Sequence, residues 1–118
     1  MYKKSSDMTV EKASELKGGV GTIKLINILN VDEMYGMGRF FGVTVIPPNC
    51  STGIHTHKDD FETYYILKGT AEVTDNDDVY ILEAGDMTQC PAGSSHSIRN
   101  IGNEDLEYIA MILYTEKR

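Results

Sequence analysis

The sequence predicts an all-β domain, and three observations support this prediction. Turn residues recur about every 8 to 12 residues. The segments between them are rich in β-branched and aromatic residues. The length of 118 residues is that of one domain. Because so short an all-β chain must protect its sheet edges, we expect barrel closure or a jelly roll of two facing sheets.

The expected strands lie between turn signals rich in Gly, Pro, Asn and Asp, from KGGVG near the start to IGNED near the end. Before the first of them, Glu11–Lys17 is compatible with a helical turn, and its pattern does not decide the matter. Another strand is expected to begin near Ser97, before the final one. The other expected strands are, in order, Thr22–Leu29, Arg39–Ile46, Thr63–Leu67, Ala71–Thr74, Val79–Leu82, Met87–Cys90 and Leu106–Tyr114.

These strands are expected to form one domain with two parts. Residues 39–118 would form the barrel, and residues 1–38 would supply N-terminal strands and an arm that pack on it. No repeat of fixed period and no linker divides the chain. We expect the arm to cover a sheet edge, either in its own subunit or in a partner's.

Composition and charge exclude several kinds of partner. The formal net charge is −7, and no stripe of Lys and Arg exists to neutralise nucleic-acid phosphates or anionic membranes. Met1–Val10 does not read as a secretory signal, so we expect a cytoplasmic protein. Cys50 and Cys90 are too few for a disulfide framework and are expected to be small, partly buried hydrophobic residues.

The stretch GIHTHKDDFETYYILKG holds the residues with the clearest chemistry. His55 and His57 are one residue apart, so on a strand they face the same way, about 6.6 Å apart along the chain. After the polar turn HKDD, a returning strand can carry Glu62 back opposite the two histidines. Such a pair of imidazoles suits two ligands of one ion.

The third histidine, His96, follows the turn CPAGSS. Three imidazoles and one carboxylate would leave one or two positions open on a divalent transition metal, as a catalytic site requires. A single histidine is more often a surface or core residue than a ligand, and for the pair alone both interpretations stay open. The full spacing of the two segments that hold the three histidines favours a metal site, because it is similar to that of a known family.

That spacing resembles the cupin superfamily, specifically its small single-domain microbial members. The first segment has His, one residue, His, four residues, Glu, six residues and Gly, from His55 to Gly69. The second runs from Gly85 through Pro91, Gly93 and His96 to Asn100 and matches the second cupin motif at every fixed position. Both motifs in register, over about residues 39–114, imply a double-stranded β-helix, the cupin jelly-roll barrel.

The resemblance implies that His55, His57, Glu62 and His96 are the ligands of one metal. The ligand set is compatible with Mn, Fe, Co, Ni, Cu or Zn. Asn100 is expected to make hydrogen bonds, either within a turn or to a metal ligand. Gly69 and Gly85 are expected to allow turns, and Pro91 to stiffen the chain before the strand of His96.

One position departs from the family pattern. Asn49 stands where a glycine is expected, with five residues between it and the His-x-His pair. Asn is the residue that best tolerates a positive φ after glycine, so the turn is expected to survive.

Tyr64 and Arg39 are two further candidates for the site. Tyr64 lies two residues after Glu62 and shares its face, as in the similar cupin lyases that cleave dimethylsulfoniopropionate; it either acts as an acid or base or packs the barrel. Arg39 would favour a carboxylate or phosphate ligand if it faced inward, but the outward, solvated position is preferred. Arg99 should point away from the site.

The fold does not choose the reaction. The favoured hypothesis is a small enzyme of the dioxygenase, isomerase or lyase class, in which the metal serves a small organic substrate as a Lewis acid or O₂ site. The alternatives are a non-catalytic binding or sensor module and, ranked last, a barrel whose metal only stabilises the fold. The resemblance also implies a homodimer, because small single-domain cupins commonly bury an outer sheet face against a second copy, and Leu106–Tyr114, apolar on both faces, agrees with this.

Overall fold

Ten strands account for most of the chain in the computed structural model, which describes residues 1–118. Three one-turn 3₁₀ helices, η1 (Ser5–Asp7), η2 (Leu16–Gly18) and η3 (Val31–Met34), all lie before the third strand. None of the helices is long and apolar enough to cross a membrane. The strands are β1 (Val10–Ser14), β2 (Thr22–Leu29), β3 (Gly38–Ile46), β4 (His55–Thr56), β5 (Asp60–Lys68), β6 (Thr70–Asp75), β7 (Asp78–Glu83), β8 (Met87–Cys90), β9 (Ser95–Asn100) and β10 (Leu106–Tyr114).

The strands predicted from the sequence are all present, and β2, β8 and β10 have the predicted bounds. β5 begins earlier than predicted, at Asp60, and β9 begins at Ser95 rather than near Ser97. The helical interpretation of residues 11–17 is wrong for its first part, because β1 continues to Ser14 before the short turn of η2. There, pairing of Lys12 with Lys24 on β2 overrides the local preference of the segment.

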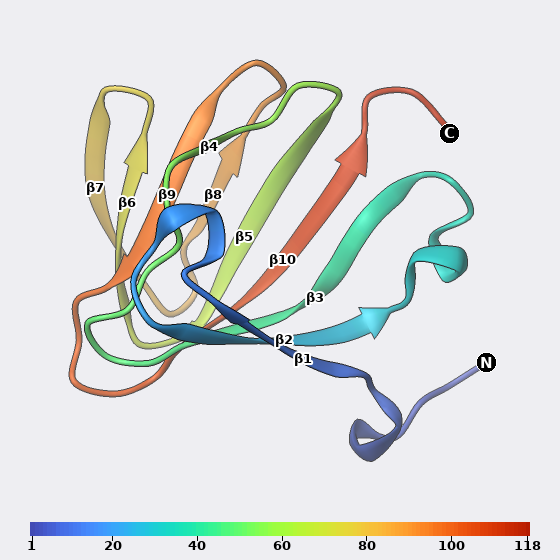
Figure 1. Ribbon diagram of the computed structural model, residues 1–118, viewed down its shortest axis with the longest axis horizontal. Coiled ribbons are helices and arrows are strands. Elements are labelled where there is room, and N and C mark those ends of the chain that lie inside the picture. The colour runs from blue at the N-terminus through green and yellow to red at the C-terminus, as the bar shows by residue number, and fades with distance from the viewer.

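Two antiparallel sheets face each other around the core, the arrangement of a double-stranded β-helix (Figure 1). The larger sheet has the strand order β1-β2-β3-β10-β5-β8, and the smaller has the order β4-β9-β6-β7. The N-terminal arm pairs through β1 with β2 of its own chain, so it covers an edge of its own subunit.

Alternation along the strands produces the core. On β10 the residues at even positions from Leu106 to Ile112 are buried, and on β5 the same holds from Asp60 to Ile66. Ile66 and Tyr108 from the larger sheet meet Val73 and Ile98 from the smaller one in a single cluster. The core therefore lies between the sheets, and the metal-ligand candidates sit in the same layer.

Two turns show why particular residues are needed. Asn49 has φ +65°, which confirms that it replaces a glycine in a left-handed turn. Gly69 has φ +92°, and a Cβ there would lie 3.0 Å from the carbonyl oxygen of Asp105. This glycine lets β5 turn directly into β6 against the chain that enters β10.

Candidate metal centre

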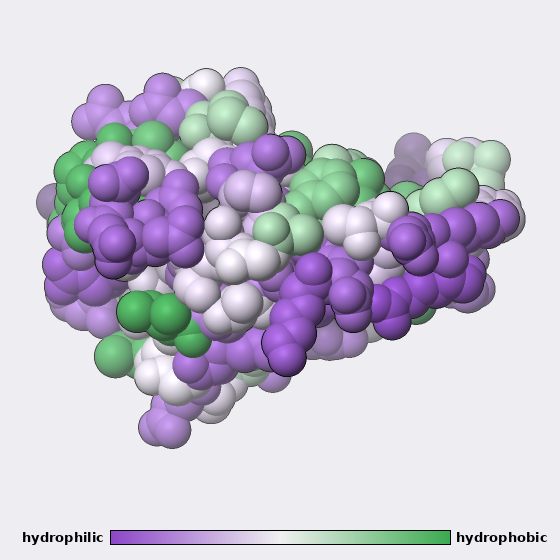
Figure 2. Space-filling model, turned by 90° about the horizontal axis from the view of Figure 1, so that it is seen from above, coloured by the Kyte–Doolittle hydropathy of each residue, from purple (hydrophilic) through white to green (hydrophobic).

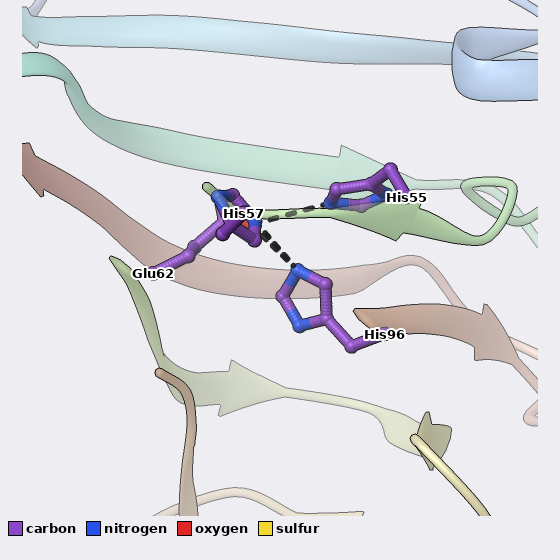
Figure 3. A group of neighbouring side chains, drawn as sticks. All are labelled: His55, His57, Glu62 and His96. Atoms are coloured by element: carbon purple, nitrogen blue, oxygen red, sulfur yellow. Dashed lines mark hydrogen bonds and ion pairs between the residues drawn. The ribbon is translucent and has the colours of Figure 1, made fainter. Parts of the chain in front are cut away.

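The four side chains predicted as metal ligands lie together inside the barrel (Figure 3). His55, His57, Glu62 and His96 each offer one ligand atom, and these atoms all lie within 4.8 Å of one another. Glu62, His57 and His96 are buried, and His55 is partly buried. The structure thus brings together every residue of the predicted set.

Strand pairing explains this convergence. β4 and β9 are antiparallel neighbours in the smaller sheet, with His55 directly opposite His96. The backbone N–H of His57 donates to the carbonyl of Ser94 at 3.0 Å, which holds the second histidine against the same edge. Glu62 comes from β5 of the larger sheet, where its side chain faces the core. The site therefore bridges the two sheets.

The spacings between the donor atoms fit one ion. Glu62 Oε1 lies 2.9 Å from His96 Nε2, 3.1 Å from His57 Nε2 and 3.6 Å from His55 Nε2. The Nε2 atoms of His57 and His96 are 3.1 Å apart. Ligand atoms about 2.1 Å from a metal and at tetrahedral or octahedral angles to one another are about 3.0 to 3.4 Å apart. The residues present thus fit a divalent ion bound by three imidazoles and one carboxylate.

Outer hydrogen bonds orient two of the imidazoles. His55 Nδ1 lies 2.9 Å from the carbonyl oxygen of Gly53, and His57 Nδ1 lies 2.6 Å from Asp60 Oδ1. Because both partners are acceptors, each Nδ1 donates a proton, and a ring that is neutral in this arrangement presents the lone pair of Nε2 to the centre. This is the tautomer that a metal ligand requires.

Asp60 is a functional candidate that the sequence analysis did not single out. It accepts from His57 through Oδ1 and from Arg39 Nε through Oδ2, the latter at 2.7 Å. The signal was present, because Asp60 lies two residues before Glu62 and shares its strand face. From the sequence alone, Asp60 belongs to the predicted polar turn HKDD, because the predicted strand begins only at Thr63.

The preferred outward position of Arg39 is wrong, because its side chain lines the pocket. On β3, Phe40 pairs with Ile112 and Gly38 pairs with Leu113, which leaves Arg39 as the extra residue of a β-bulge. A bulge redirects the side chain at that point of a strand. Arg99, by contrast, is exposed as predicted and pairs with Glu72 on the outer surface.

Charges within the site shift the pKa values of its acids and of one histidine. Burial alone raises the pKa of Glu62, but the three histidines around its carboxylate outweigh burial and hold this pKa well below its usual range. Burial likewise opposes the hydrogen bonds from Arg39 and His57 to Asp60, whose pKa is lowered. The hydrogen bond to Glu62 raises the pKa of His57. Both carboxylates are therefore ionised at neutral pH.

Tyr64 packs against the site and also touches it. Its side chain is 2% exposed, and its ring stacks on His96 with the centroids 5.1 Å apart. The phenol O–H donates to Glu62 Oε1 at 2.9 Å. Burial, followed by the charge of Glu62, raises the pKa of Tyr64 well above its usual value, so the phenol keeps its proton.

Asn100 makes structural hydrogen bonds. Its side-chain amide donates to the carbonyls of Ile46 and Glu104, both at 2.8 Å, and its Oδ1 accepts from the backbone N–H of Gly102. It thereby fixes the turn after β9, in agreement with the expectation from the sequence.

A cavity of about 180 Å³ is lined by three of the four candidate ligands, His55, His57 and Glu62. Apolar side chains from β2, β3 and β10 form much of its wall, and Thr44, Thr52 and Arg39 add polar groups. Seen from above, the molecular surface mixes hydrophilic and hydrophobic residues, with strongly hydrophobic ones at the end where β6 and β7 lie (Figure 2). The cavity suits a small organic molecule.

Fold and site together define a class of protein, a double-stranded β-helix whose barrel encloses three histidines and one carboxylate able to hold a metal ion. Residues 42–112 match the family model described as a cupin domain. The chain therefore belongs to the cupin family, as the resemblance of its two motifs implied.

A known protein and a crystal structure match this chain along nearly its whole length, and other proteins match part of it. An oxalate-binding protein of Thermotoga maritima is 39% identical over 96% of this chain and 93% of its own length. The crystal structure of a predicted oxalate decarboxylase from the same organism superimposes with a TM-score of 0.92 at 38% identity, over 97% of this chain and 99% of that one. A 5-nitrosalicylic acid 1,2-dioxygenase of a Bradyrhizobium species is 34% identical over 58% of this chain, which spans only 32% of that enzyme.

Proposed function

We propose that the protein binds one divalent transition metal through His55, His57, Glu62 and His96 and binds a small carboxylic acid at the open positions of that ion. The observation that carries this proposal is the convergence of three Nε2 atoms and Glu62 Oε1, at spacings that fit one ion, beside a cavity. A bound ion would supply a Lewis acid for ligand oxygen atoms and, if it is iron or manganese, a centre for dioxygen chemistry.

Two further observations favour a carboxylate ligand. The relative that matches nearly the full chain is an oxalate-binding protein. The pocket also contains Arg39, whose guanidinium matches a carboxylate in charge and geometry. Among the residues that line the pocket, Glu62 is the only carboxylate. If the Glu62 carboxylate binds the ion, the pocket wall has no other acidic side chain that would repel an anionic ligand.

Elemental analysis and calorimetry test both parts of the proposal. We expect about one transition-metal ion per chain in protein purified without chelator, and none in the double variant His57→Ala, His96→Ala. Oxalate should bind the metal-loaded protein and fail to bind after chelation. Unchanged metal content in the double variant would reject the ligand set, and equal oxalate binding with and without metal would reject binding at the ion.

Catalysis is the second candidate function, and the position of Tyr64 favours it. The phenol keeps its proton, is buried beside the cavity and points at the carboxylate oxygen that would bind the ion. It can therefore donate a hydrogen bond or a proton to a ligand, as an enzyme of the dioxygenase, isomerase or lyase class requires. Tyr64→Phe should retain metal and lose turnover; if no reaction occurs with metal-loaded wild type under air or without oxygen, binding remains as the function.

A homodimer is the proposed assembly, and a row of apolar residues across the larger sheet supports it. Direct pairing places one apolar residue from every strand in this row on the outer face, in the order Val10, Ile26, Val43, Ile109, Tyr65 and Met87. Val10, Tyr65 and Met87 are each about half exposed, at 52%, 47% and 55%. A second copy can cover such a row with its own.

Light scattering tests the homodimer. Wild type should have twice the mass of one chain, and Ile109→Asp, at the middle of the row, should be monomeric because a dimer would bury the new charge. Thr63→Asp, on the same face but outside the row, is the matched control. A monomeric wild type would reject the dimer.

A further inference from the structure

The β-bulge on β3 gives Arg39 a place in the pocket wall that regular alternation would deny it. Phe40 pairs with Ile112 and already faces inward, so a regular strand would turn Arg39 outward. Because Arg39 is unpaired in the register, Arg39 and Phe40 both line the same pocket although they are adjacent in the sequence. Bulges are frequent beside functional sites for this reason.

The contacts of Arg39 leave part of its guanidinium free. Nε donates to Asp60 Oδ2 at 2.7 Å, and this is the hydrogen bond that the side chain makes within the protein. The two terminal amino groups at the other edge form a fork that matches a second carboxylate. The side chain is 43% exposed, so a ligand can reach this edge.

Asp60 holds the arginine near the ion site. Its other oxygen accepts from His57 Nδ1 at 2.6 Å, so a single carboxylate lies between Arg39 and a metal-ligand candidate. Asp60 is buried and its side chain is only 11% exposed, which limits the positions that the guanidinium can take. Arg39 lines the same pocket as three of the four candidate ligands, His55, His57 and Glu62.

We propose that Arg39 is a second anchor that binds an anionic group of the ligand away from the ion, so that the ligand class is small dicarboxylic acids rather than monocarboxylic acids. The inference rests on the proposed function, because the first carboxylate of the ligand is taken to bind the ion. Arg39 is thus a specificity residue, and Asp60 keeps it in place.

The test compares acids that differ only in the second carboxylate. Succinate and propionate, and glutarate and butyrate, are titrated by calorimetry into metal-loaded wild type, Arg39→Gln, Arg39→Lys and Arg99→Gln. Wild type should bind the dicarboxylate of at least one pair about ten- to a hundredfold more tightly, as expected for a charge-assisted hydrogen-bonded pair. Arg39→Gln should abolish this preference and weaken binding of the monocarboxylate much less than binding of the dicarboxylate.

Two variants make the result specific. Arg99→Gln removes an equal charge from an exposed position that pairs with Glu72, so it should keep the wild-type preference. Arg39→Lys keeps a charge beside Asp60 but lacks the fork, so it should retain only part of the preference. Metal content is measured for every variant before titration.

The outcomes separate this inference from the proposed function. No preference in wild type, or an equal loss of both acids in Arg39→Gln, would overturn the anchor, since the arginine would then act only through Asp60 and His57. If oxalate as well as all four of these acids fails to bind metal-loaded wild type, the proposed function fails and the inference fails with it.

Discussion

Replacing Asp60 by Asn should weaken metal binding without removing a ligand. In the wild-type protein the buried carboxylate, with its lowered pKa, accepts from His57 Nδ1 at 2.6 Å. The amide of Asn can still accept through its oxygen but carries no charge, so the imidazole becomes a less basic ligand. Loss of such an outer partner costs about 10- to 100-fold in metal affinity, which equals about 1.4 to 2.7 kcal/mol.

The assay is competition with a chelator for Zn²⁺, together with the absorption spectrum of the Co²⁺-loaded protein. Asp59→Asn is the matched control, because it makes the same charge change one residue away on a side chain that is 78% exposed. The control should bind metal as wild type does. Equal affinity and identical Co²⁺ spectra for Asp60→Asn and wild type would refute the argument that Asp60 orients His57.

Three other changes have defined expected outcomes. Ile66→Ala, at a side chain that is 0% exposed, should lower the free energy of unfolding by about 2 to 5 kcal/mol in urea titrations; a loss below 1 kcal/mol would show that the site collapses to fill the cavity. Asn100→Ala should cost about 2 to 4 kcal/mol by the same measurement, since it leaves the carbonyls of Ile46 and Glu104 without their donor; Asn103→Ala, at an exposed position, is its control. Chelation should lower the free energy of unfolding by about 2.7 kcal/mol relative to protein with free metal at 100 times its dissociation constant, whereas no change would mean that the ion does not bind the folded state.

The sequence was sufficient for most of the strands, because alternation depends on local spacing, and for the four candidate ligands, because their spacing is that of the cupin motifs. Alternation places Glu62, Tyr64 and Ile66 on one face of β5 whatever the rest of the chain does. The glycines and Asn49 mark turns through their own φ preferences. The pairing of β4 with β9, which sets His55 opposite His96, is not local; the resemblance to the cupin family implied only that the two segments meet at one ion.

Arg39 and Asp60 could not be placed in the same way, because their roles depend on how separate strands align. Arg39 faces the pocket because it is itself the unpaired residue of a bulge where β3 pairs with β10. Composition does not reveal such a bulge. Asp60 gains its role only when β5 starts early enough to carry it into line with Glu62. Arg39 and Asp60 lie outside the fixed positions of the two motifs. A cupin can therefore keep the motif residues and carry other residues at these two positions. The candidate metal site rests on residues that this chain shares with its family, and the proposed choice of ligand rests on residues that the motifs leave free.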